Sequence, residues 1–519
     1  MLDGRKKVKK GVKNMSVAST SSSATFNHYK RFISDSISVF LGYIFIYGRG
    51  FILMPLLIKN VGISLYGGYV VLFTGLGFIS GVSTLGVGFS FRRFLPSSVS
   101  VLEKRKLLYP QFIFQLVSIL AICLILIILS DSIEGAFFKN QINFSMWLAV
   151  PILVVTVVYS ASNDYFRYTQ RIKRHTLAVT SESYLMVLFV VIAIVVFHKK
   201  NINMLLLAEL CALIVVSIPL ALKIYKEIGC QFLIPSRDFI VKEINLGFPL
   251  TLAYIVDFIL SGSDKFIIAF LLSVKEVGYY SPAYALASYI ILFPKVFGVV
   301  LPPLLSKATD SGEHDLSNKL ISYTLKSFIL VSVPFIIGSI ILGYPLLLLL
   351  TNKEVADAAY ITVPIIASGI FFYGLNLILC NILFVRMETK GIFSITAVSA
   401  LLNLILNIVF IYIFRSILVA AVTTFIGYFV GFTILCFKLK DTFEIKYYIP
   451  IFLKSFFASI FMAAILYYGK LTLGSSLWAV LTLIFSGILL YILFISILKV
   501  FKKSEINFVR NYLMGLNKS

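Results

Sequence analysis

The sequence predicts an all-α, polytopic membrane protein with about fourteen transmembrane helices. Hydrophobic residues make up 59% of its 519 residues, and long apolar runs recur from Ile37 to Val500. The segments between these runs alternate between rich and poor in Lys and Arg. A transmembrane helix needs about 20 mostly apolar residues. The expected spans are residues 37–58, 68–90, 109–129, 144–163, 177–197, 204–222, 246–272, 281–304, 327–349, 359–384, 392–413, 417–437, 449–468 and 476–498.

The basic residues between the spans set the orientation of the chain. The N-terminal segment and every second gap after it carry 34 Lys and Arg residues, whereas the other gaps carry 8. Cytoplasmic loops hold the excess of Lys and Arg because cationic loops resist translocation. We therefore expect an even number of spans and both termini in the cytoplasm. The four remaining cations lie inside spans, and one of them, Lys454, is close enough to the inner interface to snorkel.

The net charge of +23 does not indicate a nucleic-acid-binding protein. A nucleic-acid surface gathers its cations on one face, whereas here they are dispersed over many short loops. Their position beside helix ends favours membrane topology and attraction to anionic lipid headgroups. No nucleic-acid partner is expected.

No catalytic, metal or cofactor motif is present. The four His residues are far apart, and no two Cys form a C-x-x-C pair, so we expect no metal site and no disulfide framework. Walker A, G-x-S-x-G and H-E-x-x-H sequences are all missing. The longest expected outer loop, residues 130–143, is too short to fold into a domain that holds acceptor sugars. The chain is therefore not expected to be an enzyme.

Arg49 is the strongest candidate for a functional charge. Ionisable groups at bilayer depth cost about 2.5–3.5 kcal/mol each on insertion scales, and they persist where they face protein or a water-filled cavity. Arg49 lies near the middle of the first span, which contains no acidic residue to pair with it.

Other charges lie in the sixth, seventh and eighth spans. Asp257, Asp264 and Lys265 share one face of the seventh span, and Lys295 lies in the eighth. Asp264 and Lys265 can form a purely local ion pair, and Asp257 and Lys295 can pair across helices either as a gate or for packing alone. Glu209 is either a coupling residue or an ordinary residue near the outer interface. The candidates for coupling or gating are thus the three acids Asp257, Asp264 and Glu209.

A weak internal repeat relates the two halves of the chain. Setting Gly67 on Gly278, at an offset of 211 residues, aligns the segment from Tyr66 to Tyr69 with a second aromatic segment that includes Tyr280. Both copies start on the cytoplasmic side and are separated by six helices, so the repeat is parallel rather than inverted.

Four segments carry a resemblance to a known family. They are Tyr66–Tyr69; Leu85–Gly88 with the basic Arg92 after it; Asp264–Ile268; and Gly278–Tyr284. In these segments the chain is similar to Wzx-type lipid-linked oligosaccharide flippases, in the polysaccharide-export branch of the multidrug/oligosaccharidyl-lipid/polysaccharide exporter superfamily. The resemblance implies two six-helix lobes around a central cavity, followed by two further helices.

This resemblance also implies a domain organisation. It consists of a basic tail at 1–36, an N-lobe at 37–222, a linker at 223–245, a C-lobe at 246–437, two helices at 438–500 and a basic tail at 501–519.

The implied activity is the movement of an undecaprenyl-pyrophosphate-linked glycan across a bacterial inner membrane, without catalytic chemistry. Arg49, Lys265 and Lys295 would supply counter-charge to the pyrophosphate. The glycan would belong to an O-antigen, lipopolysaccharide, capsule or exopolysaccharide. A polysaccharide polymerase and a chain-length regulator are the expected protein partners. No cofactor is expected, and coupling to H⁺ or Na⁺ is left open.

Two alternatives stand beside this interpretation. A cation-coupled multidrug exporter of the same superfamily would also use buried acids, but the cationic bias of the deep charges disfavours cationic drugs. A membrane glycan polymerase would need a large outer loop or a catalytic His within a span.

Overall fold

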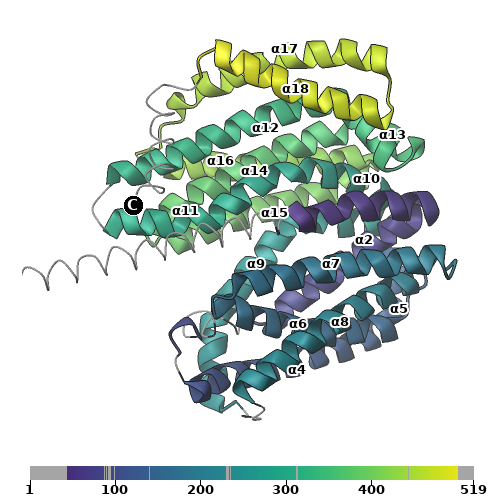
Figure 1. Cartoon of the computed structure of the whole chain (residues 1–519), viewed down its shortest axis with the longest axis vertical. Coiled ribbons are helices and arrows are strands. Elements are labelled where there is room, and N and C mark those ends of the chain that lie inside the picture. The colour runs from purple at the N-terminus through teal and green to yellow at the C-terminus, as the bar shows by residue number, and fades with distance from the viewer. Residues whose placement is uncertain are drawn as a thin grey trace, which may run out of the picture.

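The computed structural model describes residues 42, 44–86, 88, 91, 95–98, 100–139, 141–229, 233, 235–310, 314–441 and 443–500. Both tails, with Val87 and Arg92, lie outside these residues. The described part is helical and contains no strand, as Figure 1 shows. Twelve of its helices are long and apolar enough to cross a membrane, which makes the chain a multi-pass membrane protein. They are α2 (Ile63–Ser83), α4 (Val101–Ile128), α6 (Met146–Tyr168), α7 (Ile172–Val195), α8 (Ile202–Ile228), α9 (Arg237–Leu271), α12 (His314–Leu350), α14 (Thr362–Val385), α15 (Thr389–Phe414), α16 (Ile417–Lys438), α17 (Ile449–Leu473) and α18 (Leu477–Ile497).

Two further segments correspond to the first and eighth expected spans. Residues 44–60 form the first helix. The eighth span is interrupted: α10 (Val274–Ala287) passes through a 3₁₀ turn, η3 (Ser288–Ile291), into α11 (Leu292–Asp310). Pro294 explains the interruption, because proline has no N–H and its ring clashes with the carbonyl four residues earlier, inside the turn.

Short elements join the long helices. The 3₁₀ turns η1 (Leu95–Ser97) and η4 (Ile445–Tyr447) lie before α4 and α17, and α13 (Lys353–Ala359) follows α12. The predicted outer loop at 130–143 contains α5 (Ser130–Ile133) and a π-helical turn, η2 (Glu134–Phe138).

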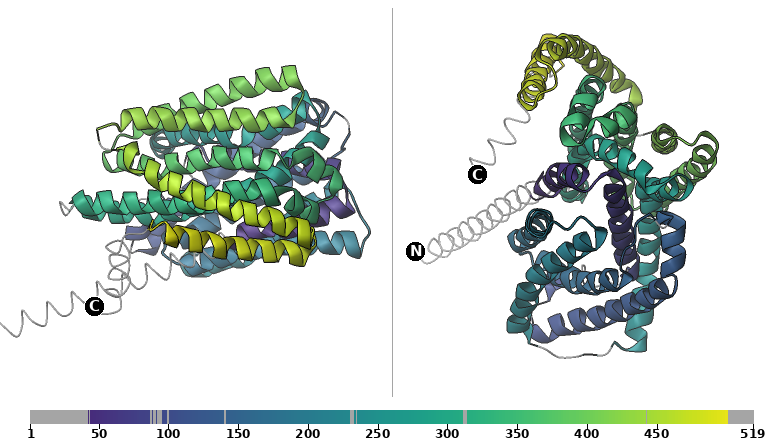
Figure 2. Two further views of the ribbon diagram at one scale, coloured as in Figure 1. Left: turned by 90° about the horizontal axis from the view of Figure 1, so that it is seen from above. Right: turned by 90° about the vertical axis from the view of Figure 1, so that its right-hand side faces the viewer.

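The long helices form two lobes. The N-lobe contains the first helix with α2, α4, α6, α7 and α8, and it is the lower half of Figure 1. The C-lobe contains α9 to α16 and makes up most of the upper half, while α9 also runs down along the N-lobe and contacts α2. α17 and α18 pack on each other and on α12, outside the C-lobe (Figure 2). This architecture agrees with the predicted fold class.

The boundary between the lobes differs from the prediction in length. α8 continues to Ile228 and α9 begins at Arg237, so the connection is shorter than the expected 223–245. A side-chain cap from Ser236 to the backbone N–H of Phe239 starts α9, a stronger signal than the hydrophobic run that begins several residues later.

A close helix contact relates the lobes at one end. α2 begins at Ile63 and α10 at Val274, a separation equal to the repeat offset. A Cβ on Gly67 would overlap the carbonyl oxygen of Val274, and a Cβ on Gly278 would overlap that of Ile63. This reciprocity is what a twofold pseudo-repeat produces. We call this the outer end, after the side on which the predicted topology would place it.

The lobes also touch at the opposite, inner end. A Cβ added to Gly247 of α9 would lie 2.5 Å from the carbonyl carbon of Gly86, just after α2. The structure therefore holds the two lobes together at both ends, with space left between them at mid-depth.

Candidate functional site

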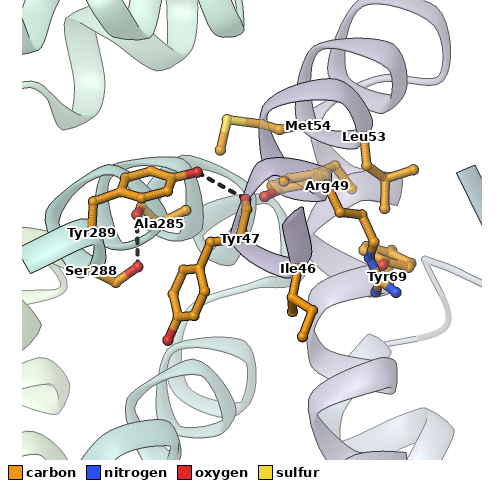
Figure 3. A pocket seen from close by; sticks show the side chains of 11 residues that line it. Ile46, Tyr47, Arg49, Leu53, Met54, Tyr69, Ala285, Ser288 and Tyr289 are labelled. Atoms are coloured by element: carbon orange, nitrogen blue, oxygen red, sulfur yellow. Dashed lines mark hydrogen bonds between the residues drawn. The ribbon is translucent and has the colours of Figure 1, made fainter. Parts of the chain in front are cut away.

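A cavity of about 300 Å³ lies between the lobes at mid-depth. Its walls come from the first helix, α2, α10 and η3 (Figure 3). It is lined by Ile46, Tyr47, Arg49, Gly50, Leu53, Met54, Tyr66, Tyr69, Ala285, Ser288 and Tyr289. Four tyrosines, one arginine and one serine in an otherwise apolar lining suit a ligand that has an anionic group and flat, partly apolar faces.

Arg49 forms the N-lobe side of this interlobe cavity. Its guanidinium reaches towards Tyr69 in Figure 3 and donates a hydrogen bond to that hydroxyl. It also lies 3.7 Å from the carboxylate of Glu182 on α7, and its side chain keeps 24% exposure. Arg49 therefore has an acid partner, though on another helix.

Glu182 is the residue that the sequence analysis missed. Its carboxyl group faces that of Glu209 on α8, and both carboxyl groups interact with Arg49. The rule that selected Arg49 would have found it, since Glu182 lies inside the fifth expected span. Glu209 is half-buried beside this pair, with its Oε2 atom fully buried.

Lys295, on α11 of the C-lobe, is not one of the residues that line this cavity, but it contacts one that does. Its Nζ donates a 2.9 Å hydrogen bond to the hydroxyl of Tyr47 on the first helix. Tyr289, from η3, donates to the backbone carbonyl of Tyr47 at 3.1 Å. Arg49 therefore lines the cavity directly, whereas Lys295 contacts the lining residue Tyr47.

Asp257 and Lys295 have different partners in this structure. The Asp257 carboxylate accepts a 2.9 Å hydrogen bond from Tyr373 on α14. It lines a separate cavity of about 340 Å³ within the C-lobe, which also includes Asn376 and Ser399. Among the described residues no ion pair joins Asp257 to Lys295, so a gate made by that pair would have to form in another conformation.

Asp264 and Lys265 form a local ion pair inside the C-lobe. Their side chains are 3.2 Å apart, and Tyr280 donates to the other carboxylate oxygen at 2.7 Å. The ammonium of Lys265 lies 4.0 Å from the ring centre of Tyr284, a cation–π contact. Lys265 is buried in these contacts and does not line the interlobe cavity.

The five motif residues divide between three roles. Tyr66 and Tyr69 line the interlobe cavity, and Tyr69 holds Arg49. Gly67 and Gly278 allow the close contact of α2 with α10, while Tyr280 anchors Asp264. The motif therefore links closure of the outer end to the cavity beneath it.

The comparisons with known proteins agree with this architecture. The sequence profile described as polysaccharide biosynthesis protein matches residues 32–309, more than half of the chain. The chain belongs to this family. The MatE profile matches residues 249–409, and together the two matches place the chain in the multidrug/oligosaccharidyl-lipid/polysaccharide exporter superfamily. No curated protein sequence matches the chain.

Solved structures share the fold. The lipid II flippase MurJ in an inward closed conformation superposes with a TM-score of 0.73 at 20% identity, covering 90% of this chain and 99% of that chain. An inward-facing multidrug resistance MATE family transporter gives 0.61 at 14% identity, covering 76% of this chain and 96% of that chain. An outward-facing MATE family transporter gives 0.55 at 13% identity, with 80% and 96% covered. The predicted two-lobe transporter fold is confirmed.

Proposed function

We propose that this chain is a flippase for a polyprenyl-pyrophosphate-linked oligosaccharide. It would move the headgroup from the cytoplasmic to the outer leaflet of a bacterial inner membrane. The prenyl tail would remain in lipid while the headgroup crosses between the lobes, by alternating access. The family supports a transport role in polysaccharide synthesis rather than catalysis.

The observation that carries the proposal is the placement of Arg49 and Lys295. They come from opposite lobes: Arg49 lines the interlobe cavity together with Tyr47, and Lys295 donates to the hydroxyl of Tyr47. A pyrophosphate cannot enter a low-dielectric site without counter-charge and hydrogen-bond donors. A bound anion could take Lys295 from the Tyr47 hydroxyl and Arg49 from Glu182, and would then contact both lobes.

The aromatic lining suits the glycan next to the pyrophosphate. Tyr289 stacks on Phe51 with ring centres 4.7 Å apart, and it meets Tyr47 at 6.1 Å. Such rings present flat apolar faces to sugars and hydroxyls to their polar edges. The identity of the sugars is left open.

Lipid extraction from a deletion strain tests this function. Repeat units on their lipid carrier should accumulate in the cytoplasmic leaflet, and surface polysaccharide should disappear. Arg49→Ala, expressed from a plasmid, should fail to restore the polysaccharide, whereas Arg49→Lys should restore part of it. Lys454→Ala is the matched control, since Lys454 lies on α17 and donates to the carbonyl of Leu498.

A second outcome would indicate a different protein class. If the repeat units reached the outer leaflet but stayed unpolymerised, the chain would be a polymerase or an accessory of one. A polymerase and a chain-length regulator are otherwise the partners that we propose for the flippase.

The competing function is export of organic cations. It is favoured by the MatE match over residues 249–409 and by the buried carboxylates Asp257 and Glu209. Accumulation of a fluorescent cationic dye in cells with and without the chain separates the two. An exporter would lower dye accumulation, and Arg49→Ala would not abolish that effect.

A further inference from the structure

A buried charge cluster lies behind the interlobe cavity, inside the N-lobe. Three of its members, Arg49, Glu182 and Glu209, come from the first helix, α7 and α8. Tyr69 of α2 and Tyr159 of α6 complete it. The Ser183 hydroxyl donates to Glu182 at 3.3 Å, and Tyr66 lies beside Tyr69 with ring centres 6.3 Å apart.

The two carboxyl groups must share a proton. They face each other and Arg49 inside the N-lobe, Glu182 at 3.7 Å from the guanidinium, and the Oε2 atom of Glu209 is fully buried. Two carboxylates in that position cannot both ionise, as the paired acids of aspartic proteases show. The pair therefore carries one negative charge, which balances the single positive charge of Arg49.

Only part of the cluster faces the cavity. Arg49 and Tyr69 line it, whereas the Glu182 side chain is 11% exposed and does not. The Oε2 atom of Glu209 and the hydroxyl of Tyr159 are fully buried and meet no hydrogen-bond partner among the described residues. An anion in the cavity would thus reach Arg49 without touching either carboxyl group.

We propose that Glu182 and Glu209 form a proton-binding site whose second proton is taken up when an anionic headgroup occupies Arg49. This deepens the proposed flippase function and rests on it. When the headgroup phosphate takes Arg49, the carboxyl pair loses its counter-charge, and a second proton neutralises it. When the headgroup leaves, Arg49 returns to the pair and the proton is released.

The sign of this linkage follows from the charges. Proton and headgroup binding reinforce each other, so the headgroup binds more tightly as the pH falls, by up to about tenfold per pH unit for one proton. The two cross together, and the proton offsets one of the headgroup's negative charges. Exchange of a proton for the headgroup would require the opposite linkage, in which protonation expels the anion.

The test uses purified full-length chain in detergent or lipid nanodiscs. The probe is farnesyl pyrophosphoryl N-acetylglucosamine, because its two diester phosphates do not titrate near neutral pH. Calorimetric titration in two buffers of different ionisation enthalpy counts the protons taken up. The wild type should take up about one proton per bound probe in the range where the pair titrates.

A double variant, Glu182→Gln with Glu209→Gln, should bind the probe with no proton uptake. Glu276→Gln, a matched acid on α10 outside the cluster, should behave as the wild type. Because the double variant leaves Arg49 without a counter-charge and could misfold, infrared difference spectra of the wild type give a second measurement. On probe binding, the protonated carboxyl band should grow while the carboxylate band falls.

Three results would overturn the proposal or its basis. Proton uptake that persists in the folded double variant, or disappears in Asp257→Asn instead, would assign the proton to another site. Tight probe binding without uptake or infrared change would exclude the linkage and leave the flippase function intact. An absence of probe binding at every pH would refute the flippase function itself, and the linkage with it.

Discussion

Replacing Gly67 with alanine should open the outer end of the protein. The new methyl group would overlap the carbonyl oxygen of Val274, a backbone atom that cannot turn aside. Overpacking of this kind costs about 1–3 kcal/mol, which corresponds to a population shift of about 5- to 150-fold away from the closed arrangement. Gly77→Ala is the matched control on the same helix, because a Cβ there meets nothing within 4 Å.

Both substitutions stabilise helix α2 by a similar amount, about 1 kcal/mol relative to glycine. Any difference between them therefore comes from the contact with α10. Spin labels at Asn60 and Lys353 would report the opening, since the neighbouring Lys59 donates to the carbonyl of Leu349 across the lobes at 2.7 Å.

In a background without native cysteines, the distance between these labels should lengthen in Gly67→Ala and stay short in Gly77→Ala. Flippase activity should fall in the first variant only, because the cycle needs the outer end to close. Equal distances and equal activity in both variants would show that the glycine contact does not hold the closed state.

Three shorter predictions concern other parts of the chain. Tyr47→Phe should free Lys295, leaving cavity shape unchanged while altering affinity for a pyrophosphate lipid by a few-fold, measured by calorimetry. Asn143→Cys should react with an impermeant maleimide from outside the cell, and labelling only after lysis would reverse the topology. At the outer end, Lys275 lies 2.8 Å from Glu354 and lowers the pKa of that carboxyl group. Their ion pair should therefore be intact at neutral pH and lost as the pH falls through the lowered pKa. In Glu354→Gln, the melting temperature should lose this part of its dependence on acid pH.

The positions of the spans could be predicted because they depend on local composition. Chain length, apolar runs and the alternation of loop charge do not require knowledge of which helices touch. The break at η3 could also have been predicted from the sequence, since Pro294 lies two residues into α11. The sequence analysis placed one continuous helix there because hydropathy ignores the missing N–H.

The directions in which the charged side chains inside the spans point could not be predicted in the same way. Lys265 and Arg49 occupy similar depths in the two repeats, yet Lys265 turns into the C-lobe towards Asp264 and Tyr284. Helix rotation decides this, and rotation is set by packing against neighbours distant in sequence. The partnership of Arg49 with Glu182 depends on the same tertiary contacts.

The two lobes are therefore alike in scaffold and different in charge. The repeat preserves the reciprocal contact of Gly67 with Gly278, which any alternating cycle must break and remake. It does not preserve the cations: the N-lobe presents Arg49 to the cavity from its first helix, whereas the C-lobe holds Lys295, on α11, against the hydroxyl of Tyr47. An anion held between them binds best when the lobes are close at mid-depth, and either end can then open once the headgroup is neutralised. The N-lobe cation, Arg49, has two acids beside it, whereas the C-lobe cation, Lys295, has a tyrosine hydroxyl as its partner. Loss of the anion should therefore restore charge balance first at Arg49.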